Sequence, residues 1–335
     1  MKECGSSRLY VCATELHVLQ SLIDIISSEV DGYIYITNNI PANESRLSEL
    51  AELSNNVEGV KATFFRQRRR FGEITKIETL KDHSEWNQFT KIIGRAFTTV
   101  LFTWNLESVY KKGQYIFQNS HKVILVEDGA MVYKRPKDST FRRLIKKIFF
   151  GIDYGFARDS KIERVYVTKV DKFSGVFKNS EVRPIEQFVN TRNLSDADVS
   201  NILKVFVSQD TTKQIESIRH LSGPNVIVFT QPMYLFNGIS KEKQISIYEN
   251  LFNKYEKKQY RIIVKRHPSD KLNYKIPSDA IIFDDPFPSE ILSAVNIHFD
   301  VAVGVCTSAV VTVNAQERIN VCDSIEEIRE LADES

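Results

Sequence analysis

A cationic stretch in the second half of the chain has the residue types to bind and activate an anion. Lys265, Arg266, His267 and Pro268 follow directly after the β-branched run 262–264. Ligands of α/β proteins bind outside the carboxyl ends of the strands, so two cations and a titratable imidazole are expected at a ligand site. A protonated His267 beside a phosphate could donate a proton or a charge-assisted hydrogen bond to a departing oxygen. A lone histidine is also a common structural residue, so the partners of this stretch decide its role.

An acidic group follows an apolar strand in the first half of the chain. Glu127, Asp128 and Gly129 come directly after the run 123–126. A carboxylate at this place could remove a proton from a substrate, and a glycine lets a ligand approach the backbone closely. The structural alternative is a turn whose two acids are simply solvated.

A pair of hydroxyl groups follows a third apolar strand. Thr307 and Ser308 come after the run 299–305 and are expected to begin a helix. Hydroxyls and free backbone N–H groups at a helix N-terminus bind anions, helped by the helix dipole, although Thr and Ser also cap many helices without any ligand. Together with the Glu127-Asp128 pair and His267, they predict a carboxylate and an imidazole that bracket a phosphate in a hydroxyl cradle.

The elements needed to position these groups are visible in the sequence pattern. Apolar strand-like runs alternate with helix-like periodicity along the chain. The expected strands are residues 9–13, 33–37, 60–65, 100–103, 123–126, 164–168, 225–230, 261–265, 280–283, 299–305 and 319–322. The expected helices include residues 16–26, 45–53, 86–96, 196–206, 241–255 and 289–294, with Thr14 and Ser195 as N-caps. Such alternation implies largely parallel, doubly wound α/β sheets.

The length and a break in the pattern indicate two domains. A chain of 335 residues suits two domains of ~150 residues each, and the junction is expected near residues 190–220. We therefore expect one Rossmann-like domain over residues 1–200 and a second over residues 201–335, facing each other across a cleft. A single large sheet with insertions is the alternative.

Several classes of function are made unlikely by motifs that the sequence lacks. There is no GxGxxG and no GxxxxGK[ST] pattern, which argues against NAD-dependent redox chemistry and P-loop phosphoryl transfer. The six histidines are scattered and the four cysteines show no CxxC spacing, so we expect no metal site and no disulfide framework. A net charge of +2 gives no reason to expect nucleic acid as a partner.

The expected location is the cytoplasm. No stretch approaches the ~18 apolar residues of a membrane-spanning helix, and the N-terminus has no signal-peptide pattern. The basic segment 134–150 could be an amphipathic helix at the inner face of the cell membrane, or it could cover its own domain with a solvated cationic face.

The order and spacing of the three groups resemble glycosyltransferase family 52, the bacterial lipooligosaccharide and capsule sialyltransferases. Bacterial sialyltransferases of the GT-B type carry a [DE]-[DE]-G motif in the N-terminal half, followed by an HP motif and a paired Ser/Thr motif. Here these are Glu127-Asp128-Gly129, His267-Pro268 and Thr307-Ser308, with the last two about forty residues apart as in the family. The resemblance spans nearly the whole chain, although each motif is short.

The resemblance implies an inverting GT-B sialyltransferase that needs no metal or other cofactor. It would move N-acetylneuraminic acid from CMP-N-acetylneuraminic acid to a terminal galactose of a lipooligosaccharide or capsule glycan, with an α2,3 linkage expected first. Members of the family can dimerise, so a homodimer is a state to test.

The family pattern also implies roles for individual residues. Asp128 would be the general base, and His267 would protonate or stabilise the leaving phosphate. Lys265 would contact the nucleotide, and Glu290 would bind the ribose hydroxyls. The remaining donor-binding residues would be Gly129, Arg266, Pro268, Thr307 and Ser308.

The sequence departs from the family pattern at one place. One branch of the family uses an aspartate in the loop after the strand that ends here at Pro232, whereas this loop has no acid before Glu242. The base is therefore assigned to Asp128. Acceptor specificity is expected from loops of the N-terminal domain, around residues 14–17 and 102–105.

Two other functions fit the same residues. A GT-B transferase or sugar epimerase with a UDP-linked substrate would also place cations and a helix N-terminus against a phosphate. A non-catalytic capsule-assembly protein could keep the fold without activity, although the complete set of Asp128, His267 and Ser308 argues against that reading.

Overall fold

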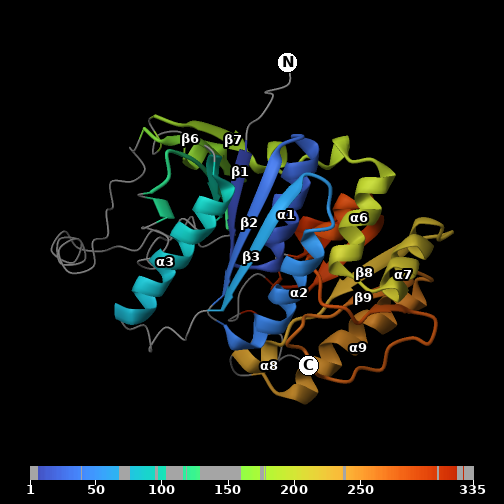
Figure 1. The fold of residues 1–335 in the computed structure, drawn as a ribbon. Helices are drawn as coiled ribbons and strands as arrows, with labels where there is room; N and C mark the ends of the chain where they lie inside the picture. Colours follow the sequence, from blue (N-terminus) through green and yellow to red (C-terminus); the bar gives the residue numbers. More distant parts are fainter. Residues whose placement is uncertain are drawn as a thin grey trace. The chain divides into compact units, whose positions relative to one another are not determined.

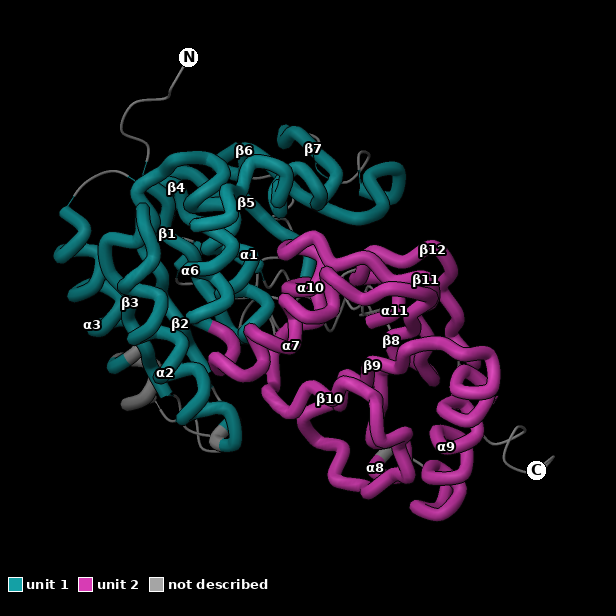
Figure 2. Tube along the Cα trace, turned by 90° about the vertical axis from the view of Figure 1, so that its right-hand side faces the viewer, with its two compact units in different colours: residues 1–205 teal, residues 206–335 magenta. Residues whose placement is uncertain are grey.

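The computed structural model describes the chain except for several segments. The described residues are 7–38, 40–67, 76–94, 97–102, 116–117, 119–128, 160–173, 177, 179–236, 239–307, 309–322 and 327. The chain divides into two compact units, Met1–Val205 and Phe206–Ser335 (Figure 2). Each unit has its own parallel β-sheet and its own hydrophobic core.

The first unit contains a seven-stranded parallel sheet in the order β3-β2-β1-β4-β5-β6-β7. Its strands are β1 (Ser7–Cys12), β2 (Asp31–Asn38), β3 (Val60–Gln67), β4 (Phe97–Leu101), β5 (Lys122–Val126), β6 (Ile162–Val167) and β7 (Glu181–Pro184). The α-helices among its described residues are α1 (Glu15–Ser27), α2 (Glu44–Ser54), α3 (Lys76–Ile93) and α6 (Asp196–Phe206), which ends at the unit boundary. Short 3-10 turns occur at η1 (Pro41–Asn43), η5 (Val170–Lys172), η6 (Ile185–Gln187) and η7 (Thr191–Asn193).

The alternation of side chains along the strands explains how helices cover this sheet. Leu9 and Val11 of β1 share a core with Trp86 of α3. Tyr10 has the opposite parity, and its hydroxyl donates to the carboxylate of Asp24 in α1 at 2.6 Å. Accordingly, α3 lies on one face of the sheet and α1 and α2 lie on the other (Figure 1).

Polar contacts cap the start of α1 and fix its other end on β1. At its start, the hydroxyl of Thr14 accepts a hydrogen bond from His17 N at 3.3 Å, as expected of an N-cap. Near its end, Asp24 pairs with Arg8 of β1 at 2.5 Å, in addition to its bond from Tyr10. Because both partners of Asp24 belong to β1, the start of α1 is held at the carboxyl end of that strand.

The second unit contains a five-stranded parallel sheet in the order β10-β9-β8-β11-β12. Its strands are β8 (Asn225–Phe229), β9 (Arg261–Lys265), β10 (Ile281–Phe283), β11 (His298–Gly304) and β12 (Asn314–Asn320). Its described helices are α7 (Gln209–Arg219), α8 (Met233–Phe236), α9 (Lys241–Lys257), α10 (Glu290–Ala294) and α11 (Ala309–Thr312). Val264 of β9 packs with Tyr248 and Phe252 of α9, so Ile263 and Lys265, which have the opposite parity, lie on the other face.

The α/β architecture with parallel sheets that the sequence predicts is confirmed in both units. β9 and α6 have the expected bounds. The sequence pattern does not indicate α7 or β7, because α7 buries just Thr211, Ile215 and Ile218 and β7 is a four-residue strand at the edge of the sheet.

Two expected helices and one expected strand are wrong in extent. α3 starts at Lys76 instead of residue 86, the helix expected to begin at residues 307–308 is the single turn α11, and β12 starts at Asn314 instead of residue 319. β11 and β12 are adjacent and parallel, and the connection between them is residues 305–313. A connection of this length leaves no room for a longer helix.

Among the residues that the structure describes, no helix is both long enough and apolar enough to cross a membrane. The basic segment 134–150 lies outside the described residues. Its expected contact with a membrane surface therefore stays a prediction.

Candidate active site

Three neighbouring strands of the first unit bring candidate residues to one edge of the sheet. β1, β4 and β5 are adjacent and parallel, so their carboxyl ends meet at the same edge. His17 lies in the first turn of α1 after β1, Phe102 follows β4, and Asp128 follows β5. The rings of His17 and Phe102 are stacked, with centroids 4.6 Å apart and an interplanar angle of 9°.

The two acids of the Glu127-Asp128 pair have different environments. Glu127 is buried, and its carboxylate accepts hydrogen bonds from the backbone N–H of Thr168 at 2.6 Å and from the Thr168 hydroxyl at 3.1 Å. It therefore joins the end of β5 to the end of β6. The side chain of Asp128 is 37% exposed, so Asp128 is the acid that a substrate can reach. Gly129 lies outside the described residues.

Asp128 has a close neighbour that the sequence pattern does not identify. Its Oδ1 lies 3.1 Å from Nε2 of His17, whose side chain is 1% exposed. The other ring nitrogen, Nδ1, accepts a hydrogen bond from the backbone N–H of Ala13 at 3.1 Å. The sequence marks residues 14–17 as an acceptor-side loop, but it gives no signal that pairs His17 with Asp128, which lies 111 positions later. That pairing follows from the order of the strands in the sheet.

In the second unit, the backbone around His267 fixes its ring. Nδ1 accepts a hydrogen bond from the backbone N–H of Ser269 at 3.1 Å, and His267 N donates to the Thr230 hydroxyl at 3.3 Å. Burial lowers the pKa of His267; Asp270 opposes this shift and the charge of Lys265 adds to it. The sequence suggests a protonated imidazole, whereas the structure favours a neutral ring that carries its proton on Nε2.

A buried polar network supports the loop that carries His267. Tyr274 OH donates to Asp270 Oδ2 at 2.8 Å, and Gln244 of α9 donates to Tyr274 OH at 2.7 Å. Asp270 N donates in turn to the carbonyl of His267 at 2.9 Å. Arg266 belongs to the same loop, since its guanidinium donates to the Leu272 carbonyl at 3.4 Å. The network connects the position of His267 to the core beneath α9.

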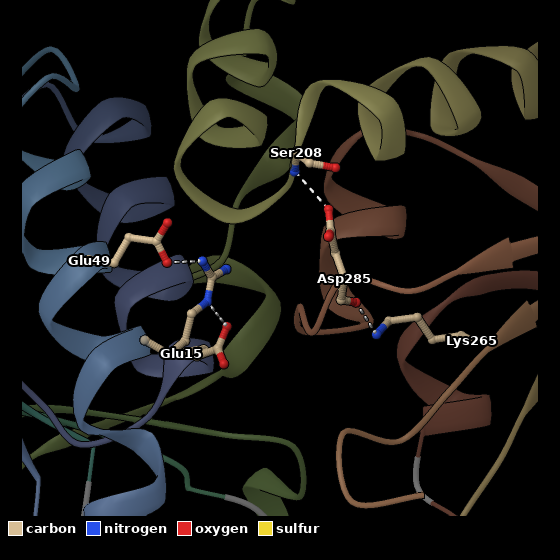
Figure 3. A network of polar contacts seen from close by, with 6 residues as sticks. Glu15, Glu49, Ser208, Lys265 and Asp285 are labelled. Carbon is tan, nitrogen blue, oxygen red and sulfur yellow. Dashed lines mark hydrogen bonds and ion pairs between the residues drawn. The ribbon is translucent and has the colours of Figure 1, made fainter. Parts of the chain in front are cut away.

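Lys265 ends β9 as a buried cation on the opposite face of the sheet. The residue is 5% exposed, and its ammonium lies 4.0 Å from the centroid of the Phe287 ring. It also lies 3.5 Å from the carbonyl of Asp285, whose carboxylate accepts from Ser208 N at 2.7 Å (Figure 3). Burial raises the pKa of Glu290, and Lys265 is among the groups that oppose this shift. Lys265 and Glu290, both predicted to bind the donor, therefore interact electrostatically in this unit. Pro268, the third residue after Lys265, is exposed.

Thr307 connects three strand ends of the second unit. Its hydroxyl oxygen accepts from Gln231 Nε2 at 2.9 Å and from Ala309 N at 3.2 Å, and its own N–H donates to Asn320 Oδ1 at 3.2 Å. An oxygen that accepts two hydrogen bonds still has its proton to donate. The full helix expected after these residues is wrong, because α11 is a single turn and one turn carries little dipole. The anion-binding role of Thr307 stays a prediction that depends on its hydroxyl group. Ser308 lies outside the described residues.

Gly304 provides a test of this arrangement. A Cβ at Gly304 would lie 2.3 Å from Thr307 Cγ2 and 3.2 Å from Val310 Cγ1. Gly304→Ala should therefore displace Thr307 and lower the free energy of unfolding of the second unit by about 1–3 kcal/mol, measured by denaturant unfolding. Adding Thr307→Ser removes the clashing methyl group but keeps the hydroxyl, so it should restore most of the loss. Equal stability of Gly304→Ala and the wild type would contradict this packing.

No cluster of three or more His, Cys, Asp or Glu side chains that could hold a metal ion occurs within the described ranges. The expectation that the chain works without a metal stays a prediction, since segments near the acidic motif are not described.

Comparisons with known proteins give a consistent result. Residues 19–321 match the family described as Alpha-2,8-polysialyltransferase. A protein of Haemophilus influenzae without an assigned function is 23% identical over 199 residues, which cover 58% of this chain and 60% of that protein. The match thus spans less than two thirds of that relative.

Two solved structures share the fold. The GT-B domain of a sialyltransferase from Photobacterium damselae superposes with a TM-score of 0.59 and 15% identity, covering 94% of this chain and 90% of that one. A Photobacterium 2,6-sialyltransferase, solved with CMP and lactose, superposes with a TM-score of 0.55 and 13% identity, covering 98% and 75%. At these identities the likeness establishes the GT-B fold, as the sequence predicts.

Proposed function

Because the chain belongs to the alpha-2,8-polysialyltransferase family, a family of sialyltransferases, we propose that it transfers a sialic acid residue from CMP-sialic acid to the end of a glycan. The observation that carries this proposal is the family match over residues 19–321. The fixed, neutral His267 at the carboxyl end of β9 supports it, since this is where a GT-B enzyme places groups for its donor phosphate.

The second unit supplies the leaving-group side of the proposed reaction. As the bond between the anomeric carbon and the phosphate oxygen breaks, its electron pair and negative charge move to CMP. A hydrogen bond from His267 Nε2–H to that phosphate strengthens as the charge grows, and so does one from the hydroxyl of Thr307. The buried ammonium of Lys265 adds a positive charge to the field, and the carboxylate of Glu290 is the proposed partner of the ribose hydroxyls.

The first unit supplies the base in this proposal. The acceptor hydroxyl attacks the anomeric carbon from the face opposite to CMP, which inverts the configuration. Its proton passes to Asp128, so one O–H bond and one C–O bond break while one C–O bond and one carboxylic O–H bond form. Asp128 is chosen over Glu127 because the carboxylate of Glu127 is occupied by Thr168.

Two acceptors are compatible with the proposed chemistry. The resemblance in the sequence points to a terminal galactose and an α2,3 linkage, whereas the family description names an α2,8 linkage, which requires a terminal sialic acid as acceptor. We favour the α2,8 product because the family match spans most of the chain. A homodimer and a membrane contact through residues 134–150 complete the proposal.

The test is release of CMP from CMP-sialic acid with lactose or with α2,8-linked disialyl-lactose as acceptor. Product mass and digestion with linkage-specific sialidases identify the bond. We expect elongation of the sialylated acceptor, unchanged by a metal chelator. Extension of lactose alone would support the α2,3 alternative.

The two alternative functions can be tested with the same purified protein. A calorimetric titration should show binding of CMP and weak or no binding of UDP. Tight binding of UDP without binding of CMP would overturn the sialyltransferase assignment in favour of a UDP-sugar enzyme. Binding of CMP without turnover on any acceptor would indicate a non-catalytic role.

A further inference from the structure

His17 is placed against Asp128 in a way that the established family membership does not require. The imidazole lies at the start of α1, and its Nε2 is 3.1 Å from Asp128 Oδ1. Its other nitrogen accepts the N–H of Ala13, and its face is stacked on Phe102. The contacts with Ala13 and Phe102 therefore fix one buried ring beside the candidate base.

The tautomer of His17 follows from these contacts. A nitrogen that accepts a hydrogen bond carries no proton, so the neutral ring must hold its proton on Nε2, the nitrogen that faces Asp128. Nε2 is buried, and within the described part of the chain it makes no hydrogen bond of good geometry. The N–H is thus close to the carboxylate oxygen but does not point along the line that joins the two atoms.

The two partners differ in their freedom to correct this misalignment. The ring of His17 is 1% exposed and stacked, whereas the side chain of Asp128 is 37% exposed. Rotation of the carboxylate toward Nε2 is therefore the available adjustment, and it satisfies a buried donor that is otherwise costly. Once Oδ1 is bound in this way, Oδ2 is the oxygen left to face an incoming hydroxyl group.

We propose that His17 is a positioning residue for Asp128: its Nε2–H binds one carboxylate oxygen and directs the other toward the acceptor hydroxyl. This inference rests on the proposed function, specifically on Asp128 as the base. The proton of the acceptor goes to Asp128, and His17 keeps its own proton throughout, so the imidazole orients the base without exchanging a proton with it.

The test uses two substitutions of equal length. His17→Gln retains an amide N–H donor for Asp128, and His17→Met has the same reach without a donor. Both lose the ring stacked on Phe102, so their melting temperatures should fall by similar amounts. We expect His17→Met to lower kcat by about 10- to 100-fold, the value of one hydrogen bond to a charged group. His17→Gln should keep most of the activity, and KM for CMP-sialic acid should change little in either variant.

A double-mutant cycle with Asp128→Asn separates positioning from a general structural effect. If His17 acts through the carboxylate, His17→Met should cost much less in the Asp128→Asn background than in the wild type. An equal cost in both backgrounds, or equal rates for His17→Gln and His17→Met, would overturn the proposal. Full activity of Asp128→Asn would instead overturn the proposed base, and the two failures are therefore distinguishable.

Discussion

Replacing Asp128 by asparagine is expected to lower kcat by about 10²–10⁴-fold, the usual contribution of a positioned base. The substitution keeps the shape of the side chain but removes the carboxylate, which would take the proton from the hydroxyl group of the glycan. Because the side chain of Asp128 is 37% exposed, the melting temperature should hardly change. The measurement is CMP release with a saturating glycan acceptor, together with thermal unfolding.

Glu127→Gln is the matched control from the same motif. Glu127 is buried and its carboxylate accepts two hydrogen bonds from Thr168, so its loss should appear in the free energy of unfolding. We expect a destabilisation of about 1–3 kcal/mol and a smaller fall in turnover than for Asp128→Asn. The reverse pattern, with a stable but inactive Glu127→Gln and an active Asp128→Asn, would exchange the two roles.

His267→Ala is expected to lower kcat by about 10²–10³-fold because the growing charge on the CMP phosphate loses a hydrogen-bond donor. His267→Gln distinguishes two ways in which the ring can act. An amide N–H replaces a donated hydrogen bond but not a transferred proton. Partial activity of His267→Gln, well above that of His267→Ala, is therefore expected if His267 stabilises the charge without transferring its proton.

The pH dependence gives a second measurement on the same residue. Burial holds the pKa of His267 below its usual value, so the ring is neutral at pH 7 and keeps its Nε2 proton as the pH rises. Between about pH 6.5 and 8, where an unperturbed histidine finishes losing its charge, kcat should show no loss that depends on His267. Acidification should instead place a proton on Nδ1 and break its bond from Ser269 N. A tenfold fall per pH unit above neutrality, absent in His267→Gln, would show that the charged form is needed.

The sequence predicts a strand well where the strand is a continuous apolar run. β9, for example, contains the apolar run 262–264 and ends at Lys265, where a polar loop begins. Strand ends also indicate where ligands bind, so His267 and Asp128 are found from the sequence alone. Their catalytic roles stay predictions, to be decided by the variants above.

Other parts of the site depend on the order of strands in the sheet. The pairing of His17 with Asp128 requires β1, β4 and β5 to be neighbours, and no local pattern carries that information. The protonation state expected for His267 is revised because burial and the backbone N–H of Ser269 are properties of the folded loop. The short α11 reflects a short connection between adjacent strands, which outweighs the local tendency to form a helix.

The two hydrogen bonds between Thr168 and the carboxylate of Glu127 have a consequence for the evolution of the chain. The two residues are 41 positions apart in sequence, yet each satisfies the hydrogen-bonding groups of the other. A change at either position should therefore be tolerated mainly with a compensating change at the other. Among divergent relatives, the first acid of the motif should covary with position 168, while the second acid, the proposed base, should be kept whatever residue occupies position 168. An alignment of such relatives would then show which acid of the motif supports the fold and which acid takes part in the reaction, without any enzyme assay.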